Sequence, residues 1–199
     1  MSGHPFPRLR WAALLWLAVW APTYAVVYGL GNFLHLCDVA VILTCLGLWR
    51  GSALLLSMQA LNILIDLAWD LDLAWRLVTG RHLLGGTEYM WETRYALGVR
   101  LLSLFHVALP VVLLAGLRRV GYDRRALAVQ SVLALLLIAA ARLLGPDANV
   151  NYSWRDPFFH RAFGPAPWHV LAIFAGLVTV VYLPTHAALS RLFRPEPRP

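Results

Sequence analysis

The sequence has no lysine, few charged residues of any kind and only two cysteines. Charged residues make up 14% of its 199 residues, and hydrophobic residues make up 60%. Soluble domains carry about 25% charged residues, and a soluble fold of this size could not bury so much apolar surface. The composition therefore excludes an ordinary soluble protein and indicates that the solvent is lipid.

The two cysteines, Cys37 and Cys45, lie eight residues apart in one apolar segment. A helix would place them about 12 Å apart, which is too far for a disulfide. Neither a CxxC pair nor a zinc-type spacing is present. The sequence thus predicts free thiols and identifies no cofactor.

All basic charge comes from arginine, and the formal net charge is +7. No basic helix or basic surface with interleaved aromatic residues lies outside the apolar segments, which excludes nucleic-acid binding. The arginines lie mainly at the ends of apolar segments, where positive charge fixes topology and contacts anionic lipid. We therefore expect membrane lipids as partners, with other membrane subunits as a further option.

Six apolar stretches follow one another along the chain. Each is long enough, or nearly so, to cross a bilayer as a helix. They predict an all-α, polytopic integral membrane helical bundle of about six transmembrane helices, forming one domain over residues 1–199. The expected helices are 11–30, 34–49, 52–75, 96–117, 125–144 and 167–190, with a short disordered tail at 194–199.

The distribution of arginine predicts the orientation of this bundle. If the N-terminus lies inside, the cytoplasmic segments carry ten arginines and the outer segments carry five. This imbalance favours a multi-pass arrangement with both ends in the cytoplasm. The long loops at about 76–95 and 145–166 are then outside, where their aromatic residues form either an interfacial belt or a cap over a site.

Ionisable residues inside the predicted helices gather at one level, in the outer half of the bilayer. Such residues are costly in lipid and usually face a cavity or each other. One interpretation is a set of ion pairs that fix helix packing, joining Asp66 or Asp70 to Arg100 and Asp38 to Arg142. The other is a water-accessible site. The residues concerned are His35, Asp38, Asp66, Asp70, Arg100, His106, Arg142 and His169.

In the second interpretation His106 is the general base and an aspartate, Asp38 or Asp66, holds its tautomer. Cys37 is the candidate nucleophile, although it also fits a small core residue. Arg100 and Arg142 would hold a lipid phosphate or an oxyanion. His35 completes the catalytic group, and Asp70 and His169 lie beside it as substrate-binding candidates. A metal held by His35, Asp38, His106 and His169 is an alternative that no HxxxH or HxxEH pair supports.

Several short motifs carry resemblances to known families. The motifs Gly31-Asn-Phe-Leu-His-Leu-Cys-Asp38, Leu104-Phe-His106, Gly121-Tyr-Asp-Arg-Arg125, Asn149-Val-Asn-Tyr152 and Leu183-Pro-Thr-His186 resemble those of a family of small uncharacterised bacterial polytopic membrane proteins. His35-Leu-Cys-Asp38 followed by Phe105-His106 is similar to a pattern of the lipoprotein intramolecular transacylases. It is also similar to small transmembrane acyltransferases and fatty-acid-ester hydrolases. These resemblances imply chemistry on acyl chains.

The leading hypothesis from the sequence is therefore a lipid-active enzyme that transfers or hydrolyses an acyl group at the outer leaflet. A non-catalytic subunit of a larger membrane complex is the first alternative, because nine tryptophans and tight apolar helices suit burial among partner proteins. A small transporter is the second, although the sequence shows no internal repeat of the kind that transporters carry.

Overall fold

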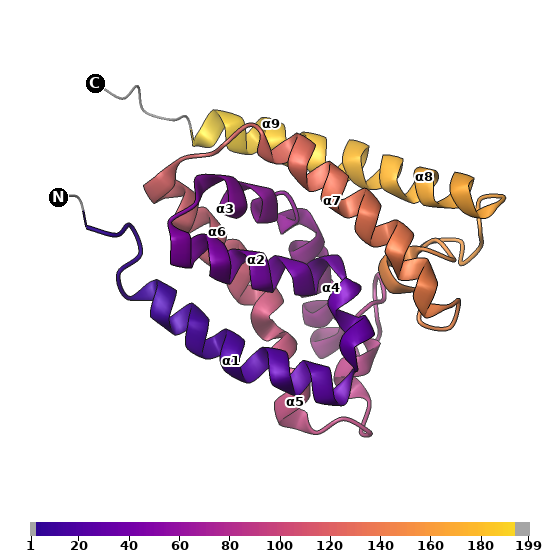
Figure 1. Ribbon diagram of the computed structural model, residues 1–199. Helices are drawn as coiled ribbons and strands as arrows, with labels where there is room; N and C mark the ends of the chain where they lie inside the picture. Colours follow the sequence, from indigo (N-terminus) through magenta and orange to yellow (C-terminus); the bar gives the residue numbers. More distant parts are fainter. Residues whose placement is uncertain (1–2, 194–199) are drawn as a thin grey trace.

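The structure is a computed structural model in which residues 3–193 are described, and this part consists of helices and their connecting loops, with no strand (Figure 1). The predicted all-α fold is confirmed. The expected tail at 194–199 lies outside the described residues. The helices are α1 (Leu9–Val27), α2 (Leu36–Arg50), α3 (Ala53–Ala60), α4 (Ile63–Thr79), α5 (Leu97–Leu101), α6 (Phe105–Val120), α7 (Ala126–Ala141), α8 (Ala166–Gly176) and α9 (Leu183–Leu192).

The number of membrane-crossing helices differs from the predicted six. In the described part, four helical stretches are long and apolar enough to cross a membrane, namely Leu9–Val27, Leu97–Val120, Ala126–Leu144 and Ala166–Leu192. The pair α3 and α4, bent by 45° at its break, makes a fifth if it counts as one span. The remaining candidate, α2, has 15 residues. It rises only about 22 Å, short of a hydrocarbon core of about 30 Å.

The turn between α2 and α3 shows how the local sequence sets these boundaries. Gly51 ends α2 in the left-handed conformation, with φ at 64°, which glycine adopts without strain. Ser52 then begins α3, because its hydroxyl accepts the Leu55 backbone N–H at 3.3 Å. The chain therefore turns tightly at residues 50–52. A Cβ on Gly51 would also lie 2.8 Å from Pro5, so the N-terminal segment packs directly against this turn.

Segments far apart in sequence meet at one end of the bundle. The Arg119 guanidinium donates to the Pro5 carbonyl at 2.9 Å, which joins the end of α6 to the segment before α1. The Tyr122 backbone N–H donates to the Phe193 carbonyl at 3.2 Å, which joins the α6–α7 turn to the end of α9. The segments that the arginine count assigns to the cytoplasm thus lie together.

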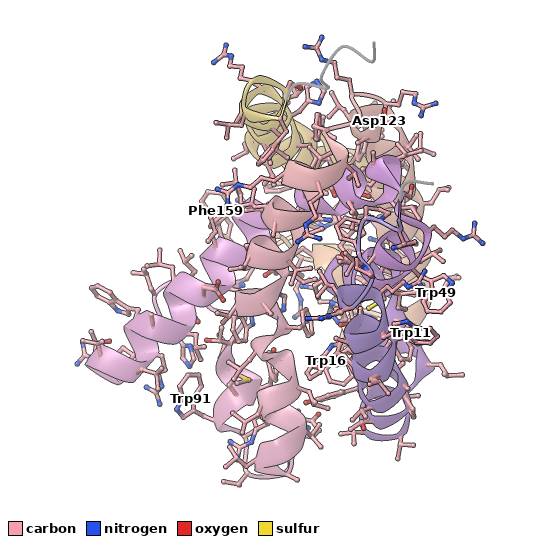
Figure 2. The ribbon with its side chains drawn as sticks, turned by 90° about the vertical axis from the view of Figure 1, so that its left-hand side faces the viewer. Trp11, Trp16, Trp49, Trp91, Asp123 and Phe159 are labelled. Atoms are coloured by element: carbon pink, nitrogen blue, oxygen red, sulfur yellow. The ribbon has the colours of Figure 1, made fainter. Side chains whose placement is uncertain are left out.

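The two long loops lie at the other end. Figure 2 shows Asp123, in the α6–α7 turn, and Trp91, in the loop after α4, at opposite ends of the molecule. In Figure 1, α7 and the α8–α9 helix run side by side along one edge, whereas α2, α3 and α6 fill the middle beside α1. The residues at about 80–96 and 145–165 therefore share one end, as an alternating arrangement of helices requires. Which end faces the cytoplasm remains a prediction.

A closed ring of four buried side chains holds the break between α3 and α4. The Tyr182 hydroxyl donates to the side-chain oxygen of Asn62 at 3.0 Å, and the side-chain amide of Asn62 donates to the side-chain oxygen of Gln59 at 3.4 Å. The Gln59 amide donates to Gln130 at 3.4 Å, and the Gln130 amide donates back to the Tyr182 hydroxyl at 3.2 Å. Each of the four is at most 3% exposed. The ring ties α3, α7 and the π-helical turn Leu177–Tyr182 to the bend, so it fixes where α4 begins.

Candidate functional site

The centre of the site is a buried pair formed by His106 and Asp66. Nδ1 of His106, in the first turn of α6, lies 2.7 Å from Oδ1 of Asp66, in the first turn of α4. His106 is 5% exposed and Asp66 is 2% exposed. The ring of Trp69 stacks on the imidazole, with centroids 4.7 Å apart and an angle of 21° between planes. An ionised Asp66 fixes the proton on Nδ1, which leaves Nε2 as the nitrogen that can accept a proton.

Two carboxylate oxygens beside this pair lack a partner in the described part of the chain. They are Oδ2 of Asp66 and Oδ1 of Asp70, one helical turn further along α4. Buried polar atoms almost always have a hydrogen-bond donor, from protein, water or ligand. The face of α4 next to His106 therefore carries two carboxylate oxygens that no donor of the described chain satisfies.

The second part of the site is the start of α2. The short 3₁₀ helix Leu30–Leu34 turns the chain so that the Asn32 amide donates to the Asp38 carboxylate. Asp38 is 2% exposed. Cys37, in the first turn of α2, has its Sγ atom 3.9 Å from Oδ1 of Asp38. His35 is the residue before α2, and α2 packs against α6, the helix that carries His106.

The ion pairs expected from the sequence are not the contacts that these aspartates make. Asp66 contacts His106 rather than Arg100, and Asp38 contacts Asn32 rather than Arg142. The physical reason is reach, because arginine extends its charged end away from apolar surroundings toward polar ones.

Both arginines bind the loops at this end instead. The Arg100 guanidinium donates to the Met90 carbonyl at 2.6 Å. The Arg142 guanidinium donates to the Ser153 carbonyl and lies over the Trp154 ring, 3.8 Å from its centroid. Nε of Arg100 is buried without a partner in the described chain. Arg100 and Arg142 therefore each hold one of the two loops, 80–96 and 145–165 respectively.

His169, a substrate-binding candidate from the sequence, has both ring nitrogens engaged by the protein. Its side chain is fully buried, at 0% exposure. Nδ1 accepts the Phe163 backbone N–H at 3.1 Å, so Nε2 carries the proton and donates to the Tyr152 carbonyl at 2.9 Å. Both nitrogens are thus used by the loop before α8, and neither remains for a ligand or a metal.

The loop 145–165 covers the start of α2. The Asn151 side chain accepts the Leu36 backbone N–H at 3.0 Å and donates to the Leu34 carbonyl at 2.8 Å. Asn149, Asn151 and Tyr152 all have positive φ, at 40°, 52° and 56°. Non-glycine residues in this region are uncommon and cluster where surrounding contacts impose them. The conformation of this part of the loop therefore supports the interpretation of the loop as a cap over the candidate site, at the segment that carries Cys37.

The tip of the same loop has the character of the predicted aromatic belt. Phe158 is 77% exposed and Phe159 is 67% exposed. Amphipathic and aromatic side chains concentrate at the membrane interface. The two interpretations left open by the sequence thus apply to different parts of one loop.

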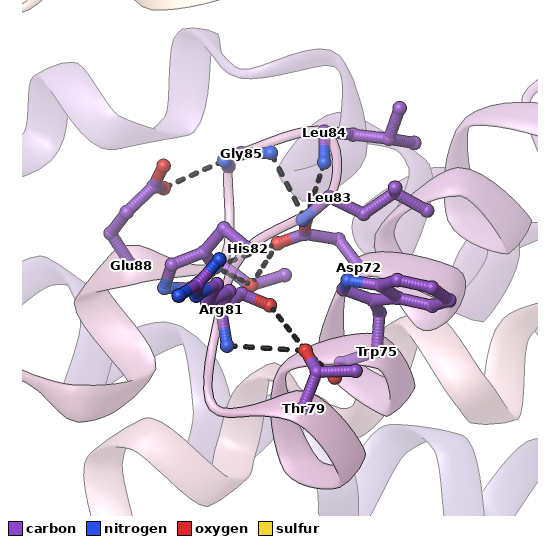
Figure 3. Close-up of polar contacts among 11 residues, drawn as sticks. Asp72, Trp75, Thr79, Arg81, His82, Leu83, Leu84, Gly85 and Glu88 are labelled. Atoms are coloured by element: carbon purple, nitrogen blue, oxygen red, sulfur yellow. Dashed lines mark hydrogen bonds and ion pairs between the residues drawn. The ribbon is translucent and has the colours of Figure 1, made fainter.

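The other loop is held by Asp72, which the sequence analysis did not single out. Figure 3 shows its carboxylate surrounded by the turn that follows α4. Oδ1 accepts the backbone N–H groups of Leu83, Leu84 and Gly85 at 2.7, 2.7 and 3.0 Å, and the His82 ring lies 3.0 Å from Oδ2. Asp72 is fully buried. The glycine pair that follows His82 was the only sequence signal for so tight a loop.

Tyr24 is the other site residue that the sequence analysis missed. Its hydroxyl lies 2.6 Å from the Ser103 hydroxyl, one helical turn before His106, and both residues are buried. This contact joins α1 to the segment that carries His106. A tyrosine in an apolar helix gives no sequence signal, because tyrosine is equally common as a core or interfacial residue.

A metal centre receives no support from the geometry. Within residues 3–193, no three His, Cys, Asp or Glu side chains are grouped closely enough to hold a metal ion. The candidates His35, Asp38, His106 and His169 are thus not brought together as one set. No protein-family model matches the chain, and no curated protein or solved structure matches it either.

Proposed function

We propose that the protein is a multi-pass enzyme of the bacterial inner membrane that transfers or hydrolyses an acyl group of a lipid at the outer leaflet. The observation that carries this proposal is the buried His106–Asp66 pair, with a 2.7 Å contact between Nδ1 and Oδ1. A histidine whose Nδ1 is held by a carboxylate is the general-base arrangement of acyl-transfer enzymes. The similarity of the His35–Asp38 and Phe105-His106 motifs to membrane acyltransferases points to the same chemistry.

The residues divide the chemistry as follows. Asp66 orients His106, and Nε2 of His106 takes the proton from the Cys37 thiol. Sγ then attacks the ester carbonyl carbon, so an S–C bond forms, the ester C–O bond breaks and His106 returns the proton to the departing alkoxide. Water or a second lipid nucleophile then cleaves the thioester. The unpartnered Nε–H of Arg100 is the donor we assign to the lipid phosphate.

Asp38 also shapes this reaction, because it lies beside the candidate nucleophile. A nearby negative charge disfavours a thiolate, so Cys37 gains reactivity from His106 at the moment of attack rather than from a permanently ionised thiol. Cys37→Ala tests its role directly. If this variant keeps full turnover while His106→Gln does not, the attacking group is a water molecule activated by His106.

The test of the proposed function uses the purified protein in phospholipid vesicles, with lysophospholipid or acylated product measured by mass spectrometry. His106→Gln keeps the size of the side chain but removes its basicity near neutral pH. We expect normal folding and a loss of turnover of about 100-fold or more. His160→Asn is the matched control, since His160 is exposed with φ at 53°, a conformation that asparagine tolerates.

The outcome also separates the enzyme from the alternative of a non-catalytic subunit. Equal turnover, or equal absence of turnover, in the wild type and His106→Gln would reject catalysis by this histidine. A stable membrane protein that co-purifies with both would then support the subunit.

A further inference from the structure

An apolar groove of about 200 Å³ lies between α1, α2 and α6. Its walls include Ala12 and Ala13 from α1, Val41 and Leu48 from α2, and Ala108 from α6. The three alanines leave the space that larger side chains would fill. Ala12 and Ala108 are exposed, so the groove opens sideways, toward the lipid that surrounds the bundle.

The groove begins directly below the candidate site. Residues at spacings of four and eleven lie on one face of a helix, so Cys37, Val41 and Leu48 form one stripe along α2. On α6, Phe105 lines the groove and its ring lies 4.3 Å from that of His106. The site and the groove therefore share two helices, with the site above and the groove beneath it.

The length of this stripe matches one leaflet of a bilayer. Eleven residues separate Cys37 from Leu48, which corresponds to a rise of about 16 Å along α2. The hydrocarbon core is about 30 Å thick, so the acyl chains of one leaflet fill about 15 Å of depth. A single chain with its carbonyl carbon at Cys37 would thus end close to Leu48.

A second, larger cavity does not offer the same fit. It has a volume of about 340 Å³ and lies between α4, α6 and α9, next to Thr185. The Thr185 hydroxyl is satisfied by the Val181 carbonyl at 2.7 Å. The lining of this second cavity includes no residue of α2, whereas the first groove continues the α2 stripe that begins at Cys37. The first groove is therefore the one that lies next to the candidate site.

We infer that this groove binds one acyl chain of the lipid substrate, inserted from the membrane between α1 and α6 with its carbonyl end beside Cys37. The identification of the bound acyl chain as part of a substrate rests on the proposed function. The binding of an acyl chain does not, because it depends only on the shape, polarity and depth of the groove.

The experiment uses the full-length protein in detergent micelles and a long-chain fatty acid with a photoactivatable diazirine at its far end. After illumination, labelled peptides are identified by mass spectrometry. In the wild type, we expect labels on the peptides that contain Leu9–Ala13 and Leu48, at the deep end of the groove. Ala108→Phe fills the groove and should lower this labelling by about tenfold.

Ala139→Phe is the matched control, because Ala139 is an exposed alanine on α7 and does not line the groove. This variant should be labelled by the fatty acid to the same extent as the wild type. Ala12→Phe fills the groove from α1 and serves if Ala108→Phe fails to elute as a monodisperse protein. Equal labelling of the wild type and both groove-filling variants, or labels spread evenly over all lipid-facing helices, would overturn the proposal.

His106→Gln separates this proposal from the proposed function. Normal labelling of this variant with lost turnover would support both. Normal labelling with unchanged turnover, together with reduced labelling of Ala108→Phe, would leave the acyl-chain site standing and remove the enzyme. Loss of labelling in His106→Gln itself would show that the chain is held at His106 rather than in the groove, and would overturn the inference.

Discussion

The contact between Asp66 and His106 predicts an energetic coupling that the pair Asp66 and Arg100 lacks. A hydrogen bond to a charged group contributes about 1.5–3 kcal/mol in soluble proteins. Side-chain hydrogen bonds between membrane helices average only about 0.6 kcal/mol, with a maximum near 1.7. The two side chains here are 6% and 3% exposed and lie 2.7 Å apart. This burial places the expected coupling at the upper end, about 1.5 kcal/mol.

The assay is a double-mutant cycle on the reversible unfolding of the protein in mixed micelles. The cycle combines Asp66→Ala with His106→Ala and compares the change in free energy of unfolding with the sum of the single changes. The control cycle combines Asp66→Ala with Arg100→Gln. Since Arg100 binds the Met90 carbonyl and shares no partner with Asp66, these changes should add to within about 0.5 kcal/mol.

Two results would refute the reasoning. A coupling below about 0.5 kcal/mol between Asp66 and His106 would mean that the pair does not form in the membrane protein. A larger coupling in the control cycle would restore the ion pair expected from the sequence, and Asp66 could then not be the group that orients His106.

Two further predictions concern the loops. A cysteine substituted at the exposed residue Ala148 should react with an impermeant thiol reagent in intact cells, whereas a cysteine at the exposed residue Arg124 should react only after lysis. The wild type is the control for the native thiols. The reverse pattern would invert the proposed orientation. Asp156 accepts the backbone N–H groups of Phe158, Phe159 and Arg161, and these donors hold its pKa below the usual range although desolvation opposes them. Its contribution to loop stability should therefore be complete above about pH 4 and disappear as the pH falls through the lowered pKa. Hydrogen exchange of the loop against pH measures this, and Asp156→Asn should flatten the profile; an unchanged profile would assign the pH response to other groups.

Much of the fold followed from apolar runs and their arginine-rich ends, but the sixth crossing did not. The run at 34–49 was counted as a short spanning helix because it is apolar throughout. The structure gives it nearly the same length, 15 residues in α2 after the 3₁₀ turn Leu30–Leu34, which is too short to cross the hydrocarbon core as a straight helix. The break between α3 and α4 was hidden for a different reason, since it depends on Tyr182 and Gln130, which are distant in sequence.

The sequence by itself determined that the protein is helical and that its helices are apolar enough for a membrane, and it predicted that several ionisable residues occupy one level of the bundle. Helix periodicity and the cost of charge in lipid are local properties, so they can be read without a structure. Only the tertiary structure decided which of these groups meet. His106 binds Asp66 and His169 binds a loop, yet both are histidines at the start of a helix. Hydrogen bonds act over about 3 Å, and contacts at that distance depend on how whole helices are bent, rotated and capped by segments far along the chain.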